Sequence, residues 1–255
     1  MTSIELTGVH VDLPVFTSRS RGLLNSVFRY AQRERSRVES VGMFSYQVHA
    51  LRGIDLRVND GDRLGLVGRN GAGKTTLLRV LSGAYEPTQG AISIDGAVSS
   101  LTDLTLGMDL DANGYENIAM RAIHLRKSRV EAQALIRDVE AFTELGDYLH
   151  LPVRTYSSGM LLRLAFAIST AVAPEILLMD EMIGAGDAQF MGKAKIRIEA
   201  LMAKVKILVL ASHNDSIIRT FCNRAVCLGE GRVLFDGEVE PCLAYYGNYS
   251  ARNAA

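Results

Sequence analysis

The sequence predicts an α/β fold in which a run of helices interrupts an alternation of strands and helices. Three observations lead to this expectation. A short apolar stretch at residues 63–67 continues into a glycine-rich loop and then into a helical pattern at residues 74–81. Helical patterns follow one another between about residues 112 and 170, with no strand pattern between them. Beyond residue 176, apolar strands and helices alternate again, as they do in layered α/β domains.

The composition limits the classes of function. The chain has 255 residues, of which 48% are hydrophobic, so one large domain with a sizeable core can form. Lys and Arg total 28, and so do Asp and Glu. Sequence-independent nucleic-acid binders usually carry a basic excess, so we expect no nucleic-acid partner. The longest apolar run, residues 164–173, is shorter than the roughly 20 residues of a membrane span. No signal peptide is visible. We therefore expect a soluble or peripheral protein in the cytoplasm.

The N-terminal third is expected to be mainly strands. Alternating or continuous apolar patterns predict strands at 4–13, 51–58, 63–67, 91–94 and 97–101. Asn59 to Asp62 has the composition of a turn, and the helix at 74–81 should end near Gly83. Residues 18–40 differ from their surroundings, because they are rich in Arg and look helical in part.

Capping signals mark the helices of the middle part. Ser128 and Glu131 form a capping-box pattern at the start of a helix expected at 128–145, and Gly146 suits its C-terminal end. The other helices of this part are expected at 115–125 and 159–173. The C-terminal part predicts strands at 176–179, 205–211, 225–228 and 232–235 and helices at 188–203, 215–221 and 240–246.

The three cysteines, Cys222, Cys227 and Cys242, lie near the C-terminus without the spacing of metal ligands. We expect them to be small residues of the core in a reducing compartment.

The glycine-rich loop after residue 67 matches the pattern G-x-x-x-x-G-K-[ST] without a deviation. Its glycines allow the backbone to curl, so that N–H groups point at phosphate oxygens, and the following helix adds its positive dipole end. Lys74 places a cation against the β- and γ-phosphates, and the Thr75 hydroxyl is a ligand for Mg²⁺. The expected cofactors are therefore a nucleoside triphosphate, ATP or GTP, and Mg²⁺. The predicted binding residues are Gly68, Arg69, Asn70, Gly71, Ala72, Gly73, Lys74, Thr75 and Thr76.

A second motif pairs two carboxylates with a buried strand. Four apolar residues, 176–179, precede Asp180 and Glu181. Ligands of α/β proteins bind at the carboxyl ends of parallel strands. We expect Asp180 to hold Mg²⁺, directly or through water, and Glu181 to act as the general base that polarises the attacking water.

With these motifs in place, the chain resembles the ATP-binding subunits of ABC transporters over about residues 4–247. Thr155 to Met160 looks like the signature motif of that family, with Ser157 and Gly159 in its Ser and second Gly positions. Residues 185–187 stand where the family has a loop that contacts the dimer partner. His213, after the strand expected at 205–211, stands where the family has its switch histidine.

The resemblance implies a single ABC-type ATPase domain over residues 1–255, with a P-loop NTPase core, an antiparallel β-subdomain and a helical subdomain insertion. The core would comprise about residues 1–111 and 171–247, and the insertion about residues 112–170. It also implies a homodimer packed head to tail, in which Ser157 and Gly159 of one subunit contact the ATP held by the other, and His213 hydrogen-bonds its γ-phosphate. Glu181, His213 and Lys74 are the catalytic residues carried over in this way.

Two positions depart from the family pattern. The family usually has a Gln between the phosphate loop and the helical insertion, but Gln89 is too early, and Asp103 or Asp109 lies closer to the expected place. The aromatic residue that stacks on adenine should precede Leu51; His49 or Tyr46 occupies about that place, and both alternatives stay open.

Within the family, the motifs around residues 114–118, 156–167 and 181–187 resemble the polysaccharide-export branch. This resemblance implies a separate pair of transmembrane permease subunits, a lipid-linked glycan as cargo, and a peripheral location at the cytoplasmic face of the inner membrane. The alternatives are a soluble ABC-type ATPase that acts on nucleic acid or ribosomes, and an importer subunit for a small solute.

A basic amphipathic helix is predicted at about residues 23–37. Leu24, Val27, Phe28 and Ala31 fall on one face, and Ser26, Arg29, Arg33 and Arg37 on the other. Such a helix suits an anionic membrane surface or a partner helix, and we expect it to guide the pyrophosphate of the cargo. The alternative is an ordinary amphipathic helix packed on its own domain.

Overall fold

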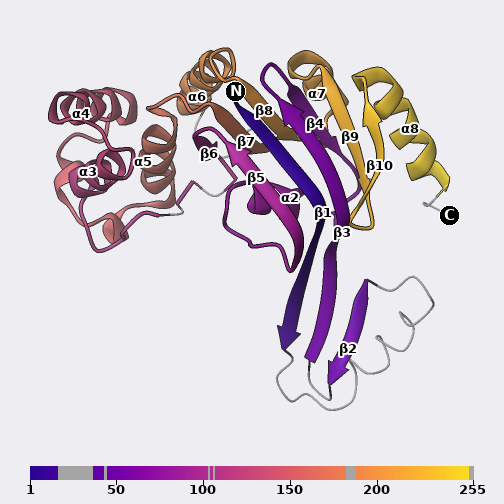
Figure 1. Cartoon of the computed structure of the whole chain (residues 1–255). Coiled ribbons are helices and arrows are strands. Elements are labelled where there is room, and N and C mark those ends of the chain that lie inside the picture. Colours follow the sequence, from indigo (N-terminus) through magenta and orange to yellow (C-terminus); the bar gives the residue numbers. More distant parts are fainter. Residues whose placement is uncertain (17–36, 43–44, 103, 106, 182–187, 253–255) are drawn as a thin grey trace. The chain divides into compact units, whose positions relative to one another are not determined.

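The computed structural model describes residues 1–16, 37–42, 45–102, 104–105, 107–181 and 188–252 (Figure 1). The chain divides into two compact units, one of residues 1–96 and 207–255 and the other of residues 97–206. The boundaries expected for a helical insertion, residues 112–170, stay a prediction. Each unit has its own sheet strands, helices and buried apolar residues, and each is described below by itself.

The first unit contains an antiparallel sheet with the strand order β2-β3-β1-β5 (Figure 1). Its strands are β1 (Ser3–Phe16), β2 (Val38–Gly42), β3 (Ser45–Asn59) and β5 (Gln89–Asp95). The pairing of β1 with β3 runs from Ser3 opposite Asn59 to Phe16 opposite Ser45, which makes both strands longer than predicted. The apolar alternation ends at about Leu13 because Pro14 and Val15 are exposed, whereas the pairing with β3 continues beyond it.

The strand β2 was not predicted. Arg37, which was expected to end a basic helix, lies in a bend directly before β2. Val38 then pairs with Val48 of β3, so the chain is already extended at the first residue after Arg37. The helix prediction is therefore wrong for residue 37, because pairing with β3 overrides the local helical pattern. The rest of the predicted helix, residues 23–36, lies outside the described residues.

The first unit also contains parallel strands. β4 (Arg63–Val67) lies between β8 (Ile207–Ala211) and β9 (Arg224–Gly229), parallel to both, and β10 (Arg232–Gly237) pairs antiparallel with β9. Every residue of β8 is buried, as expected of a parallel strand covered on both faces. The helices of this unit are α2 (Lys74–Leu81), α7 (Asp215–Phe221) and α8 (Val239–Arg252).

The final helix, α8, is longer than the predicted 240–246. Gly247 and Asn248 are poor helix formers, which is why the local pattern ends there. Aromatic packing extends the helix instead. The ring of Tyr245 stacks on Phe235 of β10 at 5.5 Å between centroids, and Tyr249 stacks on Tyr245 at 6.5 Å. Such pairs contribute about 0.5–1.5 kcal/mol beyond the area they bury.

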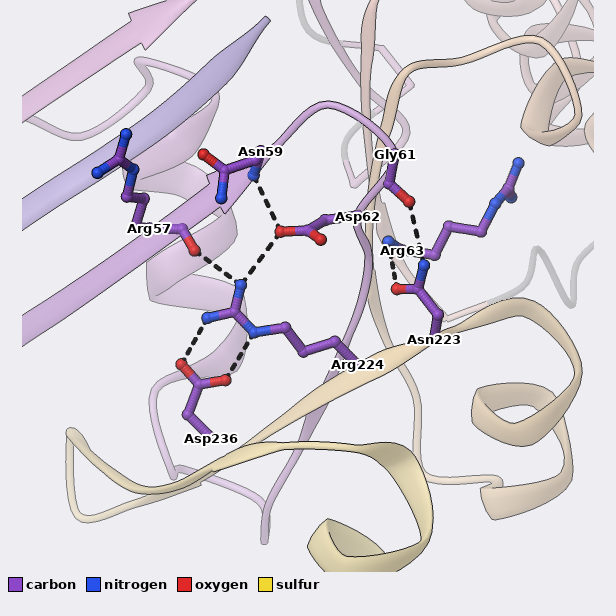
Figure 2. A network of polar contacts seen from close by, with 8 residues as sticks. All are labelled: Arg57, Asn59, Gly61, Asp62, Arg63, Asn223, Arg224 and Asp236. Atoms are coloured by element: carbon purple, nitrogen blue, oxygen red, sulfur yellow. Dashed lines mark hydrogen bonds and ion pairs between the residues drawn. The ribbon is translucent and has the colours of Figure 1, made fainter.

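A polar network ties the turn between β3 and β4 to β9 and β10 (Figure 2). Arg224 donates two hydrogen bonds to the Asp236 carboxylate, from Nε at 2.8 Å and from Nη2 at 2.7 Å. Its Nη1 donates to the carbonyl of Arg57 at 2.8 Å and to Asp62 Oδ2 at 3.1 Å. The Asn59 to Asp62 turn is confirmed, with the Asp62 amide 2.9 Å from the Asn59 carbonyl oxygen. One guanidinium thus fixes the connection that leads into β4.

The second unit combines two strands with four α-helices in its described part. β6 (Val98–Ser100) pairs parallel with β7 (Ile176–Asp180). The helices are α3 (Gly114–His124), α4 (Arg129–Thr143), α5 (Ser158–Thr170) and α6 (Ala188–Met202), with the short 3-10 helices η1 (Gly146–His150) and η2 (Val153–Thr155). Helices α3, α4 and α5 lie together (Figure 1). They share one apolar cluster that includes Ile118, Val139, Leu149 and Leu164.

The capping box at Ser128 and Glu131 is confirmed, since each side chain bonds the backbone amide of the other. The prediction for Gly146 is wrong. Glu144 is the C-terminal cap of α4 and takes the left-handed conformation, with φ 54°, while Gly146 starts η1. Helix α4 therefore ends at Thr143, two residues before the predicted end at residue 145. Helix α5 also ends earlier than predicted, at Thr170 rather than at residue 173.

Cys227 and Cys242 are fully buried and Cys222 is half-buried, and all three are free thiols. The expectation that they are core residues is confirmed. Burial raises the pKa of Cys222 and Cys242 to about 12 and that of Cys227 to about 11.

No helix in the described part of the chain combines the length and the hydrophobicity that crossing a bilayer requires.

Candidate functional site

The phosphate-loop pattern lies between β4 and α2, as predicted. β4 ends at Val67 and α2 begins at Lys74. Leu66 of β4 is in register with Ala211 of the parallel strand β8. Gly68 and His213 each follow this register position by two residues, at the carboxyl ends of adjacent strands. The first unit therefore brings the phosphate loop and His213 to the same edge of its parallel strands, where α/β proteins bind ligands.

Two glycines allow the loop to take this path. A Cβ on Gly68 would lie 2.4 Å from the Leu228 carbonyl oxygen, so only glycine fits against β9. Gly73 has a φ of 113°, which L side chains rarely adopt, and a Cβ there would lie 3.1 Å from the Ala50 carbonyl oxygen. The glycine spacing of the motif is thus required by close backbone approach as well as by curvature.

The Lys74 side chain lies across this loop. Its residue is only 7% exposed, and Nζ donates to the carbonyl oxygens of Gly68 at 2.6 Å and Arg69 at 3.3 Å. A buried ammonium group requires such partners. Because both partners are carbonyls of the loop itself, the positive charge is concentrated where the pattern predicts phosphate.

The N-terminus of α2 is built to receive an anion. Its N-cap, Gly73, supplies no side-chain hydrogen bond to the first-turn amides. Helices α3, α4, α5 and α7 are each capped by a side chain, namely Asn113, Ser128, Ser157 and Asn214. An uncapped helix start carries donor amides and the positive dipole end, which phosphate oxygens satisfy. The loop and the start of α2 therefore suit the binding of a nucleoside triphosphate.

Sequence reasoning missed the residues that brace this loop from outside. The Gly231 amide, in the turn between β9 and β10, donates to the Ala72 carbonyl at 2.9 Å. The Gly231 carbonyl in turn accepts from the Arg52 amide of β3 at 2.7 Å. Arg37 donates from Nη1 to the Gly71 carbonyl. No motif could reveal these contacts, because the partners are backbone groups that tertiary structure alone places together.

His49, one of the two residues predicted to contact the base, lies on β3. Its Nδ1 is 2.7 Å from Asp12 Oδ1, and its side chain is 28% exposed. Tyr46 lies three residues earlier on the same strand, opposite Val15. Successive side chains of a strand point to opposite faces, so His49 and Tyr46 belong to different faces of β3. Only one of them can contact a base, and the choice between them stays a prediction.

The carboxylate pair lies in the second unit, at the end of β7. Asp180 is the last residue of β7 and is half-buried, after four fully buried residues. Glu181 is exposed and has a φ of 63°, in the left-handed region. Non-glycine residues held there cost about 1–3 kcal/mol and gather at functional sites. Residues 185–187, predicted to contact a dimer partner, lie outside the described residues.

The structure describes two of the residues considered for the missing Gln. Gln89, which is too early in the sequence, belongs to β5 of the first unit and pairs with His10 of β1. The Asp109 carboxylate accepts a hydrogen bond from the Asp111 amide at 2.9 Å, before the start of α3. Asp103 lies outside the described residues, and the choice between it and Asp109 stays open.

The signature residues begin α5. Ser157 is the N-cap of this helix, and its Oγ accepts from the Met160 amide at 3.3 Å. Ser157 and Gly159 are both exposed, and a Cβ on Gly159 would meet no atom within 4 Å. The packing of the described residues thus does not require a glycine at residue 159.

The predicted site residues thus fall into two groups. The first unit holds the phosphate loop, His213 and His49, and the second unit holds Asp180, Glu181, Ser157 and Gly159.

The comparisons with known proteins agree with these motifs. A family model described as ABC transporter matches residues 51–184. The chain is 44% identical over 236 residues to the O-antigen export system ATP-binding protein RfbE of Yersinia enterocolitica, covering 91% of this chain and 97% of that one.

Two longer relatives carry related names. The O-antigen export system ATP-binding protein RfbB of Myxococcus xanthus is 40% identical over 78% of this chain, and the teichoic acids export ATP-binding protein TagH of Shouchella clausii is 36% identical over 79%. The chain spans about half of these two relatives, 46% and 56% of their respective lengths.

Solved structures show the same fold at low sequence identity. The ATP-binding subunit of an ABC transporter superposes with a TM-score of 0.67 at 19% identity, covering 96% of this chain and 93% of that one. The ATP-binding cassette MJ0796, solved as a post-hydrolysis dimer with ADP and Pi, gives a TM-score of 0.63 at 18% identity and covers 92% of this chain and 98% of its own.

Proposed function

The chain belongs to the ABC transporter family of ATP-binding proteins, and on that premise we propose that it powers the export of a lipid-linked polysaccharide across the cytoplasmic membrane. The chain is an ATPase of ABC type, with the α/β fold expected of one. The export function is supported by the relatives from Yersinia enterocolitica, Myxococcus xanthus and Shouchella clausii, whose names all refer to export of O-antigen or teichoic acid.

The observation that carries the ATPase chemistry is the uncapped start of α2 beside the buried Lys74. The negative charges of a triphosphate repel one another. The ammonium group and the first-turn amides offset this repulsion, because they supply positive charge and hydrogen-bond donors in one place. On ATP binding, Lys74 exchanges its carbonyl partners at Gly68 and Arg69 for phosphate oxygens. His213, at the same edge, donates to the γ-phosphate in this proposal.

Mg²⁺ suits the oxygen donors of this chain, since carboxylate and hydroxyl oxygens are its preferred protein ligands. Thr75, in the first turn of α2, and Asp180, at the end of β7, would hold it. When bound, the ion neutralises charge on the β- and γ-phosphates. Glu181 accepts a proton from the attacking water, which makes the water a better nucleophile.

The functional unit is proposed to be a homodimer that binds a pair of transmembrane permease subunits at the cytoplasmic face of the membrane. Exposed Ser157 and Gly159 at the start of α5 support this arrangement, since both are open to solvent and a Cβ on Gly159 would meet no atom within 4 Å. In the dimer they contact the triphosphate on the partner's phosphate loop. The other functions considered, action on nucleic acid or import of a small solute, find no support among the relatives named above.

Deletion of the gene in its native host tests the export proposal. We expect lipid-linked glycan to accumulate on the cytoplasmic side of the membrane and surface glycan to disappear. The wild-type chain should restore export, whereas Lys74→Ala, produced at the same level, should not. Normal surface glycan in the deletion strain would contradict the proposal.

A further inference from the structure

The Arg37 guanidinium joins two elements of the first unit. Nε donates to the His49 carbonyl at 3.1 Å and Nη2 to the Ala50 carbonyl at 2.6 Å, both on β3. Nη1 donates to the Gly71 carbonyl in the phosphate loop. Three donors of one planar group thus bind three backbone carbonyls, a pattern that Lys cannot reproduce.

An irregularity of β3 presents the Ala50 carbonyl to this guanidinium. Leu51 is paired with Val11 of β1, but the next pair is His49 with Asp12, so Ala50 is an extra residue on its strand. Such bulges leave one residue outside the regular pairing and re-aim the backbone. The Ala50 carbonyl also leaves no room for a side chain at Gly231, because a Cβ there would lie 2.6 Å from the carbonyl oxygen.

The backbone of Arg37 is itself held in place. Its carbonyl accepts a hydrogen bond from the His49 amide at 2.8 Å, and the next residue, Val38, pairs with Val48. The amide and the carbonyl of His49 are therefore both bound to Arg37. With its Nδ1 on Asp12, His49 is fixed at three points. A guanidinium anchored in this way lies in position before any nucleotide arrives.

The contact with Gly71 has consequences for the loop amides. In a trans peptide the carbonyl and the following amide point in opposite directions. Arg37, by holding the Gly71 carbonyl, therefore orients the Ala72 amide, which donates to the Arg69 carbonyl at 3.0 Å. The Gly231 amide, by holding the Ala72 carbonyl at 2.9 Å, orients the Gly73 amide in the same way.

Burial and neighbouring charge agree with a preorganised role. Burial lowers the pKa of Arg37, and the nearby Arg52 cation lowers it further, whereas Glu230 raises it. The guanidinium has thus exchanged part of its hydration for the three carbonyls, two on β3 and one in the phosphate loop.

We propose that Arg37 is a positioning residue for nucleotide binding, which holds β3 at His49 and Ala50 and the phosphate loop at Gly71 in a fixed mutual arrangement. The inference rests on the proposed function, since it assumes that ATP is the ligand of the loop. Arg37 does not touch the reacting atoms; it acts through the backbone of the loop and of β3.

Isothermal titration of the chain with Mg²⁺ and ADP tests the role, using Arg37→Gln, Arg37→Lys and the control Arg57→Gln. Arg57 lies on β3, the strand that Arg37 contacts, and its side chain is exposed. We expect both Arg37 variants to raise the Kd for ADP by about tenfold, because small misplacements of a preorganised site cost this much or more. The exposed control should stay within about twofold of wild type.

A purely structural role predicts a different result. Loss of a structural tie lowers the melting temperature of the nucleotide-free protein but leaves the Kd of the folded protein unchanged. A Kd within about twofold of wild type in Arg37→Gln would therefore overturn the proposal, whatever the melting temperature. Wild-type affinity in Arg37→Lys would overturn it as well, since charge alone would then suffice.

A second variant, Gly231→Ala, perturbs the contact between Arg37 and the Ala50 carbonyl without changing Arg37. Gly231→Ala places a methyl group against the Ala50 carbonyl and, at 3.3 Å, against Arg37 Nη2. It should weaken ADP binding while Arg37 is intact, and unchanged binding in a folded Gly231→Ala protein would count against the proposal. If the wild-type chain binds no ADP, the proposed function itself fails. If it binds ADP and only the Arg37 and Gly231 effects are missing, the positioning role alone is refuted.

Discussion

The Lys74 ammonium lies 2.6 Å from the carbonyl oxygen of Gly68, so the last cation of the phosphate-loop motif bonds back to its first glycine. This contact closes the loop on itself and keeps a buried charge satisfied until phosphate replaces the carbonyls. It also makes the loop and its lysine one structural unit.

Lys74→Ala should weaken ATP binding by about 10- to 100-fold, since a hydrogen bond to a charged group contributes about 1.5–3 kcal/mol. Titration with ATP in the presence of Mg²⁺ measures the loss. Lys206→Ala is the matched control, because Lys206 belongs to a surface ion pair with Glu175 and should keep wild-type affinity. Equal ATP affinity in Lys74→Ala and wild type would exclude the phosphate-loop assignment.

Glu181→Gln should bind ATP normally and hydrolyse it at least about 100-fold more slowly, because general bases contribute 10²- to 10⁴-fold to rates. The rate of phosphate release under saturating ATP measures this effect. A wild-type rate would remove Glu181 from the role of base.

The left-handed backbone of Glu181 permits a separate test of strain. Glu181→Gly should raise the free energy of unfolding by about 1 kcal/mol, since glycine adopts a φ of 63° without strain, while hydrolysis is lost. Urea unfolding of this variant beside Glu181→Gln, which keeps the strain, isolates the backbone effect. Equal stability of the two variants would show that the conformation stores no strain.

Two glycines at helix starts of the second unit should behave in opposite ways. In Gly159→Asp the added Cβ would meet no atom within 4 Å, and the carboxylate would lie in the first turn of α5, so stability should be kept or slightly raised. Hydrolysis should nevertheless be lost, because that carboxylate would face the triphosphate of the partner subunit.

Gly114→Ala, by contrast, should destabilise the fold by about 1–3 kcal/mol, since the added Cβ would lie 2.7 Å from Leu149 Cδ2. Chemical unfolding and ATPase assays of both variants compare the two glycines. Loss of stability in Gly159→Asp equal to that in Gly114→Ala would contradict a role outside the chain for Gly159.

The buried thiols predict a loss of stability in alkali. Burial raises the pKa of Cys242 to about 12, above its ordinary value of 9.0. The unfolded chain therefore loses this proton above pH 9 while the folded chain retains it. The stabilisation is complete below pH 9 and is lost as the pH rises toward 12, by up to about 1.4 kcal/mol per pH unit.

Unfolding free energies at pH 7, 9 and 10.5 check this slope, because these values lie below, at and above the ordinary thiol pKa of 9.0. Cys242→Ala should be less stable than wild type at pH 7 but should lose less stability between pH 9 and 10.5. Parallel curves for the two proteins would show that Cys242 does not titrate differently in the two states.

The sequence predicted the parts of the fold that depend on local pattern. The apolar run predicted β4, the glycines predicted the phosphate loop, and the helical period predicted α2. The Ser128 cap was predicted from its partner Glu131. The strand β2 could not be predicted in this way, because its pairing with β3 competes with a helical pattern around residue 37. The end of α8 depends on aromatic contacts with β10, which no local pattern contains.

The candidate site divides along the same line. Lys74, Asp180 and Glu181 were predicted from motifs and His213 from the family resemblance, because the expected chemistry requires particular residue types at particular strand ends. Arg37 and Gly231 were missed in that role, since they act on backbone carbonyls and amides that lie far away in the sequence. Contacts of this kind leave no pattern except a turn composition at Glu230-Gly231.

Mixing two inactive variants measures most directly whether the site is shared between two copies of the chain. Lys74→Ala disables the phosphate loop and Gly159→Asp disables the signature, so each protein alone should be inactive. In an equal mixture half of the dimers are mixed, and each mixed dimer has one intact site when loop and signature come from different subunits. We expect about a quarter of the wild-type ATPase rate per chain to return. A mixture as inactive as its separate components would contradict the shared site.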